Sequence, residues 1–240
     1  MRSVIDAKRS VLRIIKDGRM VLDDATCSFD EALGYYKDGC TLLLRYAERS
    51  HAGLAALARD FADGFATEVD IQCYCTPGRE QAFLWHYDVE EVFILQTQGA
   101  KAYEIRPNTV HPNPLVTSIP DDLKYETERT PVRIAATIAD GDWLYIPSGW
   151  WHIARTQAES MHISVGCMPV AHVQLFDFLK QVLAQDPQWR MRLPLFIPDA
   201  SEEQKYYGAL MKTLSKTLSR FLETEETRDQ WLSWLKTRKP

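Results

Sequence analysis

Two residue types that bind metal ions stand close together in the segment FLWHYDVEEVFILQTQGAKAYEI, which runs from Phe83 to Ile105. His86 and Asp88 are two residues apart, and an apolar stretch typical of a strand follows them. Side chains at positions i and i+2 of a strand point to the same side, so an imidazole and a carboxylate can face one point. The spacing predicts two metal ligands on a strand or at its end.

A second histidine completes this set from a distant part of the chain. His152 ends the motif GDWLYIPSGWWH. If its strand lies opposite His86 and Asp88 in one barrel, two imidazoles and one carboxylate meet there. Such a set occupies one face of an Fe(II) ion and leaves the remaining positions for O₂ and a co-substrate. A single histidine is more often a structural residue than a ligand, so the prediction depends on all three residues together.

The remaining histidines lack such partners in the sequence. His51 and His111 lie in loop-like contexts, and His172 opens a predicted helix. His162 alternates with Ser164 on a predicted strand, so it can neighbour the site, and we interpret it as a structural residue.

Lys101 follows the same strand segment and raises a separate question. A buried ammonium is costly unless it is paired. A dicarboxylate co-substrate such as 2-oxoglutarate would bind iron through its keto-acid end and require a cation for its far carboxylate, a role that Lys101 fits. The alternative is a solvated lysine in the turn-like tripeptide GAK, and the spacing alone favours neither.

The elements that must position these residues are short, β-rich segments separated by Pro, Gly and Asp, between residues 71 and 170. Their density predicts an antiparallel barrel or sandwich. The Pro-rich residues 107–131 are expected to form a long loop over one mouth of the barrel. The predicted strands are IQCYCTP, EVFILQTQG, KAYEIR, VRIAATI, DWLYIPS and MHISVGCMP.

Segments on either side of this β-rich region are partly helical. Before it, GRMVLDD and CTLLLRY are predicted strands, and HAGLAALARDFADGF is a predicted amphipathic helix. After it, VAHVQLFDFLKQVLAQ is predicted to be helical, and a second helix is predicted to begin with a capping box at Ser201. A third, short helix carries Trp231 and Trp234. We therefore predict a catalytic domain over residues 1–170 and a helical segment over residues 171–240.

The second C-terminal helix carries a long apolar stripe that must be buried somewhere. Pairing of two copies is a common solution, so we predict a homodimer built by this segment. The alternative is that the segment folds back on its own barrel. The stripe consists of Tyr207, Leu210, Leu214, Leu218 and Phe221.

Composition limits the classes of partner. The chain has 240 residues, a formal net charge of −5 and a sequence pI near 5.7, which argues against a broad electrostatic grip on nucleic acid. No apolar run approaches the roughly 18 residues needed to span a membrane. The start, MRSVIDAKRS, lacks signal-peptide features. Five scattered cysteines predict reduced thiols and a cytoplasmic location, and the pair Cys73 and Cys75 is interpreted as two strand residues rather than metal ligands.

Three motifs together resemble the JmjC-type, cupin-fold oxygenases that depend on Fe(II) and 2-oxoglutarate. They are YCTPG from Tyr74, HYDVEEVFILQTQGAK from His86, and GDWLYIPSGWWH ending at His152. The sequence is most similar to the ribosomal-oxygenase branch, which hydroxylates side chains of ribosomal proteins. The resemblance implies a double-stranded β-helix, or jelly-roll, mainly β with flanking helices. It also implies a dimerising helical segment like the one that follows the catalytic domain in that branch.

The resemblance also assigns roles to residues. His86, Asp88 and His152 are expected to bind iron, and Lys101 to bind the distal carboxylate of 2-oxoglutarate. Tyr74 is expected to assist through its hydroxyl. Ser164 matches a small hydroxyl position near the same pocket.

Two departures concern the substrate rather than the iron chemistry. The branch usually continues into a winged-helix domain, for which the chain is expected to have no room. Bulky Phe83 and Trp85 precede His86, where small residues are common.

Three functions therefore remain open. The first is hydroxylation of a side chain of a peptide, protein or amino acid, with decarboxylation of 2-oxoglutarate to succinate and consumption of O₂. The second is N-methyl demethylation by the same oxidation. The third is a non-catalytic, metal-binding cupin module, against which the complete ligand set argues.

Overall fold

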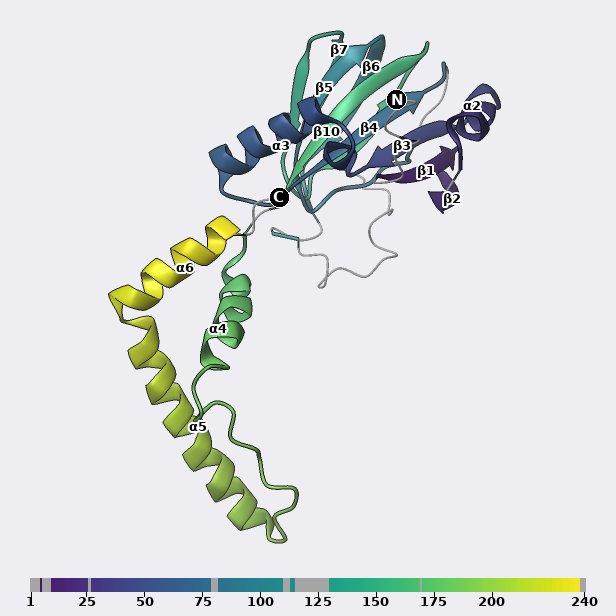
Figure 1. Cartoon of the computed structure of the whole chain (residues 1–240). Coiled ribbons are helices and arrows are strands. Elements are labelled where there is room, and N and C mark those ends of the chain that lie inside the picture. Colours follow the sequence, from purple (N-terminus) through teal and green to yellow (C-terminus); the bar gives the residue numbers. More distant parts are fainter. Residues whose placement is uncertain are drawn as a thin grey trace. The chain divides into compact units, whose positions relative to one another are not determined.

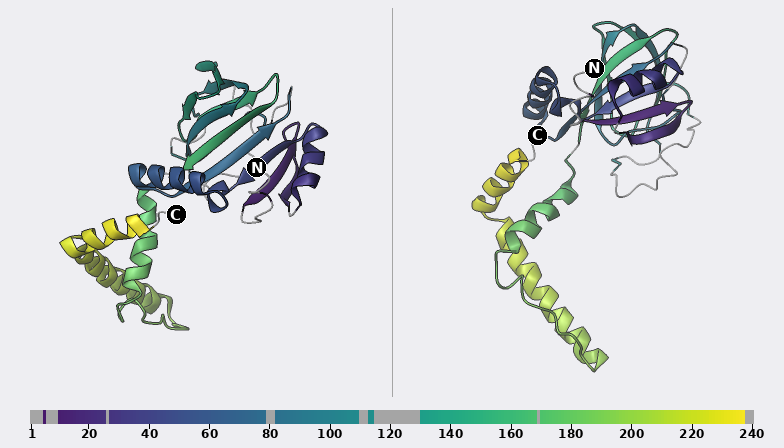
Figure 2. Two further views of the ribbon diagram at one scale, coloured as in Figure 1. Left: turned by 45° about the horizontal axis from the view of Figure 1, so that its top comes forward. Right: turned by 45° about the vertical axis from the view of Figure 1, so that its right-hand side comes forward.

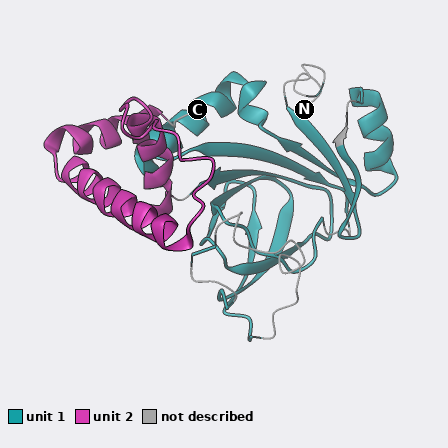
Figure 3. Ribbon diagram, turned by 90° about the horizontal axis from the view of Figure 1, so that it is seen from below, with its two compact units in different colours: residues 1–169, 239–240 teal, residues 170–238 magenta. Residues whose placement is uncertain are grey.

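The structure is a computed structural model of the chain, and it describes residues 5, 10–25, 27–78, 82–109, 113–114, 130–168 and 170–237. The chain divides into two compact units (Figure 3). Unit 1 comprises residues 1–169 with 239–240, and unit 2 comprises residues 170–238. The catalytic role expected for the first region and the dimerising role expected for the second remain predictions.

Unit 1 is built on two antiparallel sheets, which Figures 1 and 2 show from several sides. The larger sheet has the strand order β2-β1-β3-β4-β10-β5-β8, and the smaller has the order β7-β6-β9. The prediction of a mainly β architecture with flanking helices is confirmed. The strands are β1 (Val11–Lys16), β2 (Arg19–Ala25), β3 (Thr41–Arg45), β4 (Val69–Thr76), β5 (Glu91–Gln98), β6 (Ala100–Arg106), β7 (Ile134–Ala139), β8 (Trp143–Ile146), β9 (Trp151–Arg155) and β10 (Ser160–Cys167).

Two helices pack against the larger sheet. Helix α2 (Phe29–Lys37) contacts β3, and helix α3 (Ala52–Phe65) contacts β4 and β10. Between β3 and α3 lies the short 3₁₀ helix η1 (Ala47–Arg49). Ser28 and Glu31 form a capping box at the start of α2. His51 caps α3, because its Nδ1 accepts a hydrogen bond from the Leu54 amide at 3.4 Å, which explains this histidine without a role in the site.

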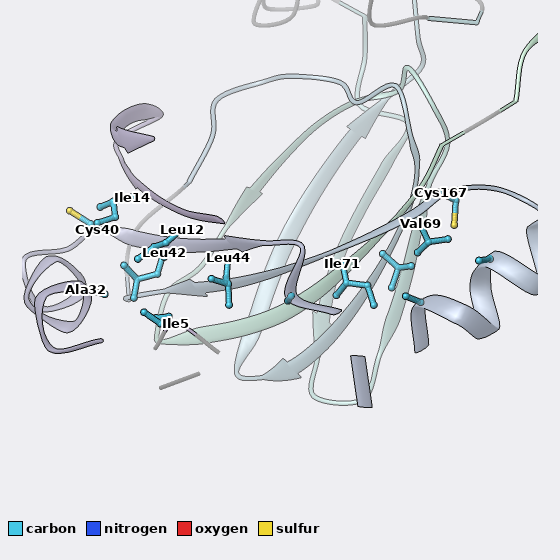
Figure 4. Close-up of a cluster of buried hydrophobic side chains, with 14 residues drawn as sticks. Ile5, Leu12, Ile14, Ala32, Cys40, Leu42, Leu44, Val69, Ile71 and Cys167 are labelled. Atoms are coloured by element: carbon cyan, nitrogen blue, oxygen red, sulfur yellow. The ribbon is translucent and has the colours of Figure 1, made fainter. Parts of the chain in front are cut away.

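The main hydrophobic core lies between the helices and one face of the larger sheet (Figure 4). Strand β3 shows how a continuous apolar run serves two faces. Leu42 and Leu44 join this core, whereas Leu43 packs on the other face with Ile15 and Ala82. A strand buried on both faces needs apolar residues at every position, which accounts for the sequence TLLLR.

Strand register brings the inward-facing side chains of the larger sheet into rows. His162 on β10 lies opposite Tyr74 on β4 and Gln96 on β5. Two residues further along, Ser164 lies opposite Gln72 on β4. Directly paired residues point to the same face, so these side chains are neighbours.

The smaller sheet supplies a second set of rows. His152 on β9 lies opposite Ile105 on β6, and Tyr103 lies opposite Ala154. Lys101 comes four residues before Ile105 on the same strand and faces the same side. At about 3.3 Å per residue, its Cα lies roughly 13 Å along the strand from the level of His152.

Unit 2 consists of a 3₁₀ turn, η4 (His172–Gln174), and three helices, α4 (Leu175–Leu183), α5 (Ala200–Leu222) and α6 (Glu225–Thr237). The three predicted helical segments are confirmed. Phe178 on α4 is buried against the rings of Trp231 and Trp234, at centroid distances of 5.4 and 6.1 Å. The predicted capping box at Ser201 is wrong. The helix begins at Ala200, and the Asp199 carboxylate caps it by accepting hydrogen bonds from the backbone amides of Ser201 and Glu202.

Two further expectations concern segments rather than side chains. The predicted loop over residues 107–131 falls largely outside the described residues. Among the helices that the structure describes, none is both long enough and apolar enough to cross a membrane.

Candidate active site

Three metal-ligating side chains converge between the two sheets. One ligand atom from each of His86, Asp88 and His152 lies within 4.8 Å of the other two. The Asp88 Oδ2 atom is 3.5 Å from His152 Nε2 and 4.0 Å from His86 Nε2. Bonds of about 2.0–2.2 Å to each atom would fit an ion between them.

Backbone hydrogen bonds fix which nitrogen of each histidine faces this point. His86 Nδ1 lies 2.7 Å from the Leu84 carbonyl oxygen, and His152 Nδ1 lies 3.1 Å from the Trp150 carbonyl oxygen. A carbonyl oxygen only accepts, so each Nδ1 carries the proton and donates it. In the neutral form of each imidazole, which is the form that binds a metal, Nε2 then keeps a lone pair directed toward Asp88.

Local structure holds the three residues in register. His86 and His152 form an isolated antiparallel bridge, with backbone hydrogen bonds of 2.8 and 3.2 Å between them. The Gly149 amide donates to the Asp88 carbonyl oxygen at 2.7 Å. Gly149 has a φ of +77°, and a Cβ there would lie 2.2 Å from Asn108 Nδ2, so the turn before His152 requires glycine. The prediction that His86 and Asp88 share one side is consistent with this arrangement.

A cavity that opens to solvent extends from the three ligands into the barrel. All six residues singled out in the sequence line it: His86, Asp88, His152, Lys101, Tyr74 and Ser164. Seven more described residues complete the lining: Ala82, Phe83, Val92, Ile94, Tyr103, Ala154 and His162. The structure thus brings the predicted set together, and the function of each member remains to be tested.

Lys101 is buried, which excludes the alternative of a solvated lysine in a turn and leaves its carboxylate-binding role as a prediction. Its side chain is 3% exposed. Its Nζ lies 3.0 Å from Thr76 Oγ1 and 3.2 Å from His162 Nδ1. Within the described parts of the chain, no carboxylate forms an ion pair with it. Burial lowers the pKa of Lys101 to about 7, because the charged form loses its hydration.

Tyr74 and His162 form the wall next to Lys101. Their rings stack with centroids 4.5 Å apart and planes 9° apart. The Tyr74 hydroxyl donates to Gln72 Oε1 at 3.0 Å, and burial raises its pKa well above the usual value. Burial also lowers the pKa of His162, and the neighbouring Lys101 lowers it further, so this imidazole is neutral.

Two of these wall residues were not assigned to the site from sequence. His162 was interpreted as structural, yet it is 5% exposed and contacts Lys101. Tyr103 was not singled out, although it stands two residues after Lys101 in the strand AKAYEIR and must share its face. In both cases the sequence signal was a spacing of two residues from a suspected site residue. His162 has this relation to Ser164, and Tyr103 has it to Lys101.

An open groove of about 770 Å³ adjoins the cavity and shares six lining residues with it. Its other walls carry both signs of charge, from Arg13, Arg45 and Glu90. Arg45 forms an ion pair with Asp70 at 3.4 Å. The groove thus offers polar donors and acceptors beside the metal ligands.

Three tryptophans near the third motif, Trp143, Trp150 and Trp151, do not line the cavity. Trp143 lies on the outer face of β8 and is 49% exposed. Trp150 packs against a small core cluster, and Trp151 is buried against Tyr87, with ring centroids 5.0 Å apart. Their aromatic rings serve packing, which is the commoner use of large aromatic residues.

None of the five cysteines, all of which the structure describes, forms a disulfide bond. Cys73 and Cys75 both lie on β4, as interpreted from sequence, and neither joins the metal-binding cluster.

Residues 53–175, slightly more than half of the chain, match the JmjC domain family. The chain therefore belongs to the JmjC domain family, as its motifs predicted. A relative named bifunctional lysine-specific demethylase and histidyl-hydroxylase NO66 from Drosophila yakuba is 28% identical over 170 residues, covering 68% of this chain and 25% of the relative. The protein of the same name from Dictyostelium discoideum is 29% identical over 133 residues, covering 55% of this chain and 26% of the relative.

Among solved structures, the ribosomal oxygenase YcfD from Escherichia coli in complex with cobalt and 2-oxoglutarate has a similar fold. The TM-score is 0.66 at 18% identity, and the match covers 97% of this chain and 60% of YcfD. This likeness confirms the predicted jelly-roll fold. The chain spans roughly a quarter of the length of these two curated relatives and well under two thirds of YcfD.

Proposed function

We propose that the protein is an Fe(II)- and 2-oxoglutarate-dependent oxygenase that hydroxylates a side chain of a peptide, protein or amino acid. One observation carries the proposal. Two imidazoles and a carboxylate converge at one part of a cavity that also contains a buried ammonium with no carboxylate partner among the described residues. The ligand set suits Fe(II), and the ammonium suits the far end of a dicarboxylate.

The donor set fits the metal in its details. His86 and His152 present Nε2 lone pairs, and Asp88 presents a carboxylate oxygen. Three protein ligands on one face leave positions for a bidentate co-substrate and O₂. Bound iron with 2-oxoglutarate would supply the oxidising power, with O₂ consumed and the co-substrate converted to succinate and CO₂.

The chain's own residues then position the reactants and exclude water. Lys101 binds the distal carboxylate, which supplies the buried ammonium with a counter-charge that no described carboxylate provides. The stacked rings of Tyr74 and His162 wall that end of the cavity, and Ser164 adds a hydroxyl to the lining. The adjoining groove admits the substrate side chain to the remaining face of the metal site.

The groove supports hydroxylation over demethylation of a methylated lysine. A methylammonium group is typically held by several aromatic faces. Besides the ligand His86, the described groove lining includes two aromatic residues, Tyr74 and Phe83, and one face of Tyr74 is covered by His162. Charge does not separate the two reactions, because Arg13 and Arg45 are paired with Asp23 and Asp70 and the same lining carries Asp88 and Glu90. The curated relatives carry both activities in their name, and YcfD is called a ribosomal oxygenase, so a protein side chain is the proposed substrate class.

Product analysis tests this proposal. Purified protein supplied with Fe(II), 2-oxoglutarate and O₂ should release succinate faster when incubated with peptides from candidate proteins. Mass spectrometry should then show a gain of one oxygen on the peptide. Loss of one methylene from a methylated peptide would instead favour demethylation. Absence of 2-oxoglutarate turnover and binding would reject both reactions.

Co-substrate binding is expected to take up a proton above neutral pH. The free Lys101 ammonium has a pKa of about 7, lowered by burial, whereas a bound carboxylate stabilises the charged form. Above pH 7 the free site is mostly neutral and must be protonated on binding. The affinity for 2-oxoglutarate should therefore fall by about tenfold per pH unit above 7. Calorimetry in buffers of different ionisation enthalpy measures the proton uptake directly.

Lys101→Arg provides the control for this linkage. A guanidinium remains protonated throughout the range, so the variant should bind with little dependence on pH above 7. An equal slope in wild type and variant would assign the pH dependence to another group.

We further propose that unit 2 pairs two copies of the chain. Within unit 2, helix α5 has no buried residue, and the predicted stripe from Tyr207 to Phe221 is only half-buried. The connection before α5 adds Leu195 and Phe196, which are 106% and 79% exposed. Apolar surface on this scale is typical of an interface.

Light scattering at micromolar concentration should give the mass of a dimer, and the double variant Leu195→Asp, Phe196→Asp should shift it toward the monomer. A monomeric wild type would contradict the pairing and favour a segment that folds back on its own barrel.

A further inference from the structure

We propose that Tyr103 and His162 complete the carboxylate-binding end of the cavity, Tyr103 as a hydrogen-bond donor to the carboxylate and His162 as a positioning residue for Lys101. This inference rests on the proposed function, because it concerns the same co-substrate. It assigns the hydrogen bond from a tyrosine hydroxyl to the distal carboxylate to Tyr103 rather than to Tyr74.

The hydroxyl of Tyr103 is buried and lacks a hydrogen-bond partner in the part of the chain that the structure describes. Tyr103 is 2% exposed and lines the cavity. Within the described residues, its Oη has no hydrogen-bond partner. Burying a hydroxyl without a hydrogen bond is unfavourable, and native structures rarely leave one so unless a ligand or water supplies the partner. Tyr103 and Lys101 are two residues apart on β6, so the hydroxyl and the ammonium lie on the same side of the strand.

Tyr74 is less available for this contact. Its hydroxyl proton is already donated to Gln72 Oε1 at 3.0 Å. A phenol has one proton to donate, so Tyr74 would have to release Gln72 before it could donate to a carboxylate. Tyr103 can donate without breaking a protein hydrogen bond.

His162 orients the ammonium of Lys101. Its Nδ1 lies 3.2 Å from Lys101 Nζ, and a charged ammonium only donates, so Nδ1 accepts and the imidazole proton lies on Nε2. Stacking on Tyr74 fixes the plane of the ring. Thr76 Oγ1, at 3.0 Å, accepts a second ammonium proton. The two acceptors together leave the third proton of Lys101 for the carboxylate.

A phenylalanine substitution separates ligand binding from folding. Tyr103→Phe should weaken 2-oxoglutarate binding to the Mn(II)-loaded protein by about tenfold, as expected for one hydrogen bond to a charged group. The same variant should unfold at a higher temperature than wild type without co-substrate, because it removes an unpartnered buried hydroxyl. A residue that only supports the fold would not give these opposite effects.

The matched control is Tyr87→Phe. Tyr87 is also 2% exposed with an unpartnered hydroxyl among the described residues, but its ring packs against Trp151 outside the cavity lining. This variant should also unfold at a higher temperature and should retain wild-type affinity for 2-oxoglutarate. Equal weakening in both variants would attribute the loss to packing and overturn the assignment of Tyr103.

His162 is tested by a rescue pair. His162→Phe keeps a ring to stack on Tyr74 but removes the acceptor, and should weaken 2-oxoglutarate binding at least tenfold. His162→Asn offers an amide oxygen near the position of Nδ1 and should recover most of the affinity. Equal affinity in the phenylalanine variant and wild type would overturn the positioning role.

Calorimetry on the wild type separates the two levels of the proposal. If the Mn(II)-loaded wild type does not bind 2-oxoglutarate, the proposed function fails. If the wild type binds and Tyr103→Phe binds equally well, the proposed function stands and the assignment of Tyr103 is wrong.

Discussion

Asp88→Ala is expected to abolish oxygenase turnover and to weaken metal binding by more than about 100-fold, beyond the loss typical of changes in the residues around a metal site. The variant removes the carboxylate that both histidines face, at 3.5 and 4.0 Å. Two imidazoles alone would hold Fe(II) poorly, because the third position on the protein side would pass to water. Equilibrium titration with Mn(II) or Co(II), followed by dialysis and metal analysis, measures the loss.

The control removes a carboxylate that has no place in the site. Asp60 is exposed on α3, so Asp60→Ala should leave metal binding and turnover unchanged. Folding of Asp88→Ala should be checked by circular dichroism. A folded Asp88→Ala variant with wild-type metal affinity would remove this residue from the metal site.

Lys101→Ala is expected to weaken 2-oxoglutarate binding by a factor of about 10² to 4 × 10³ while leaving metal affinity near normal. The estimate follows from the roughly 3–5 kcal/mol that is typically lost when one partner of a buried ion pair is removed. The ammonium is 3% exposed and has no carboxylate partner in the described parts of the chain, so the co-substrate would be its only counter-charge there. Calorimetry on the Mn(II)-loaded variant measures the affinity.

A second variant distinguishes charge from volume. Lys101→Met removes the ammonium but fills most of the space of the side chain, so it should bind 2-oxoglutarate as weakly as Lys101→Ala. If the methionine variant bound as tightly as wild type, the loss in the alanine variant would reflect an enlarged cavity, and Lys101 would have no direct role.

The metal ligands could be predicted from sequence because their spacing carries geometry. The i, i+2 relation of His86 and Asp88 places two side chains on one side wherever the backbone is extended. The approach of His152 depends on a β-bridge between distant segments, which spacing cannot show by itself and the resemblance supplied. Burial of Lys101 was undecided for the same reason, because GAK is equally compatible with a turn.

Other features depended on tertiary packing. Among the described residues the Tyr103 hydroxyl has no hydrogen-bond partner, which depends on the register of β6 with β9 and on the residues across the barrel. The local sequence AKAYEIR specifies neither. The donation from Tyr74 to Gln72 joins residues two apart on one strand, yet nothing local requires it. The sequence did not predict the N-cap at Asp199, because Ser201 also fits a capping pattern. In the structure the Asp199 carboxylate caps the helix instead.

The most direct test of the metal and co-substrate site is a crystal structure of the protein grown with Mn(II) and 2-oxoglutarate without O₂, with the metal located by anomalous scattering. The expected result is one Mn(II) ion bound by His86 Nε2, His152 Nε2 and an Asp88 carboxylate oxygen. The co-substrate should chelate this ion and extend its far carboxylate to Lys101 Nζ. A metal bound elsewhere, or a 2-oxoglutarate carboxylate that does not reach Lys101, would contradict the account.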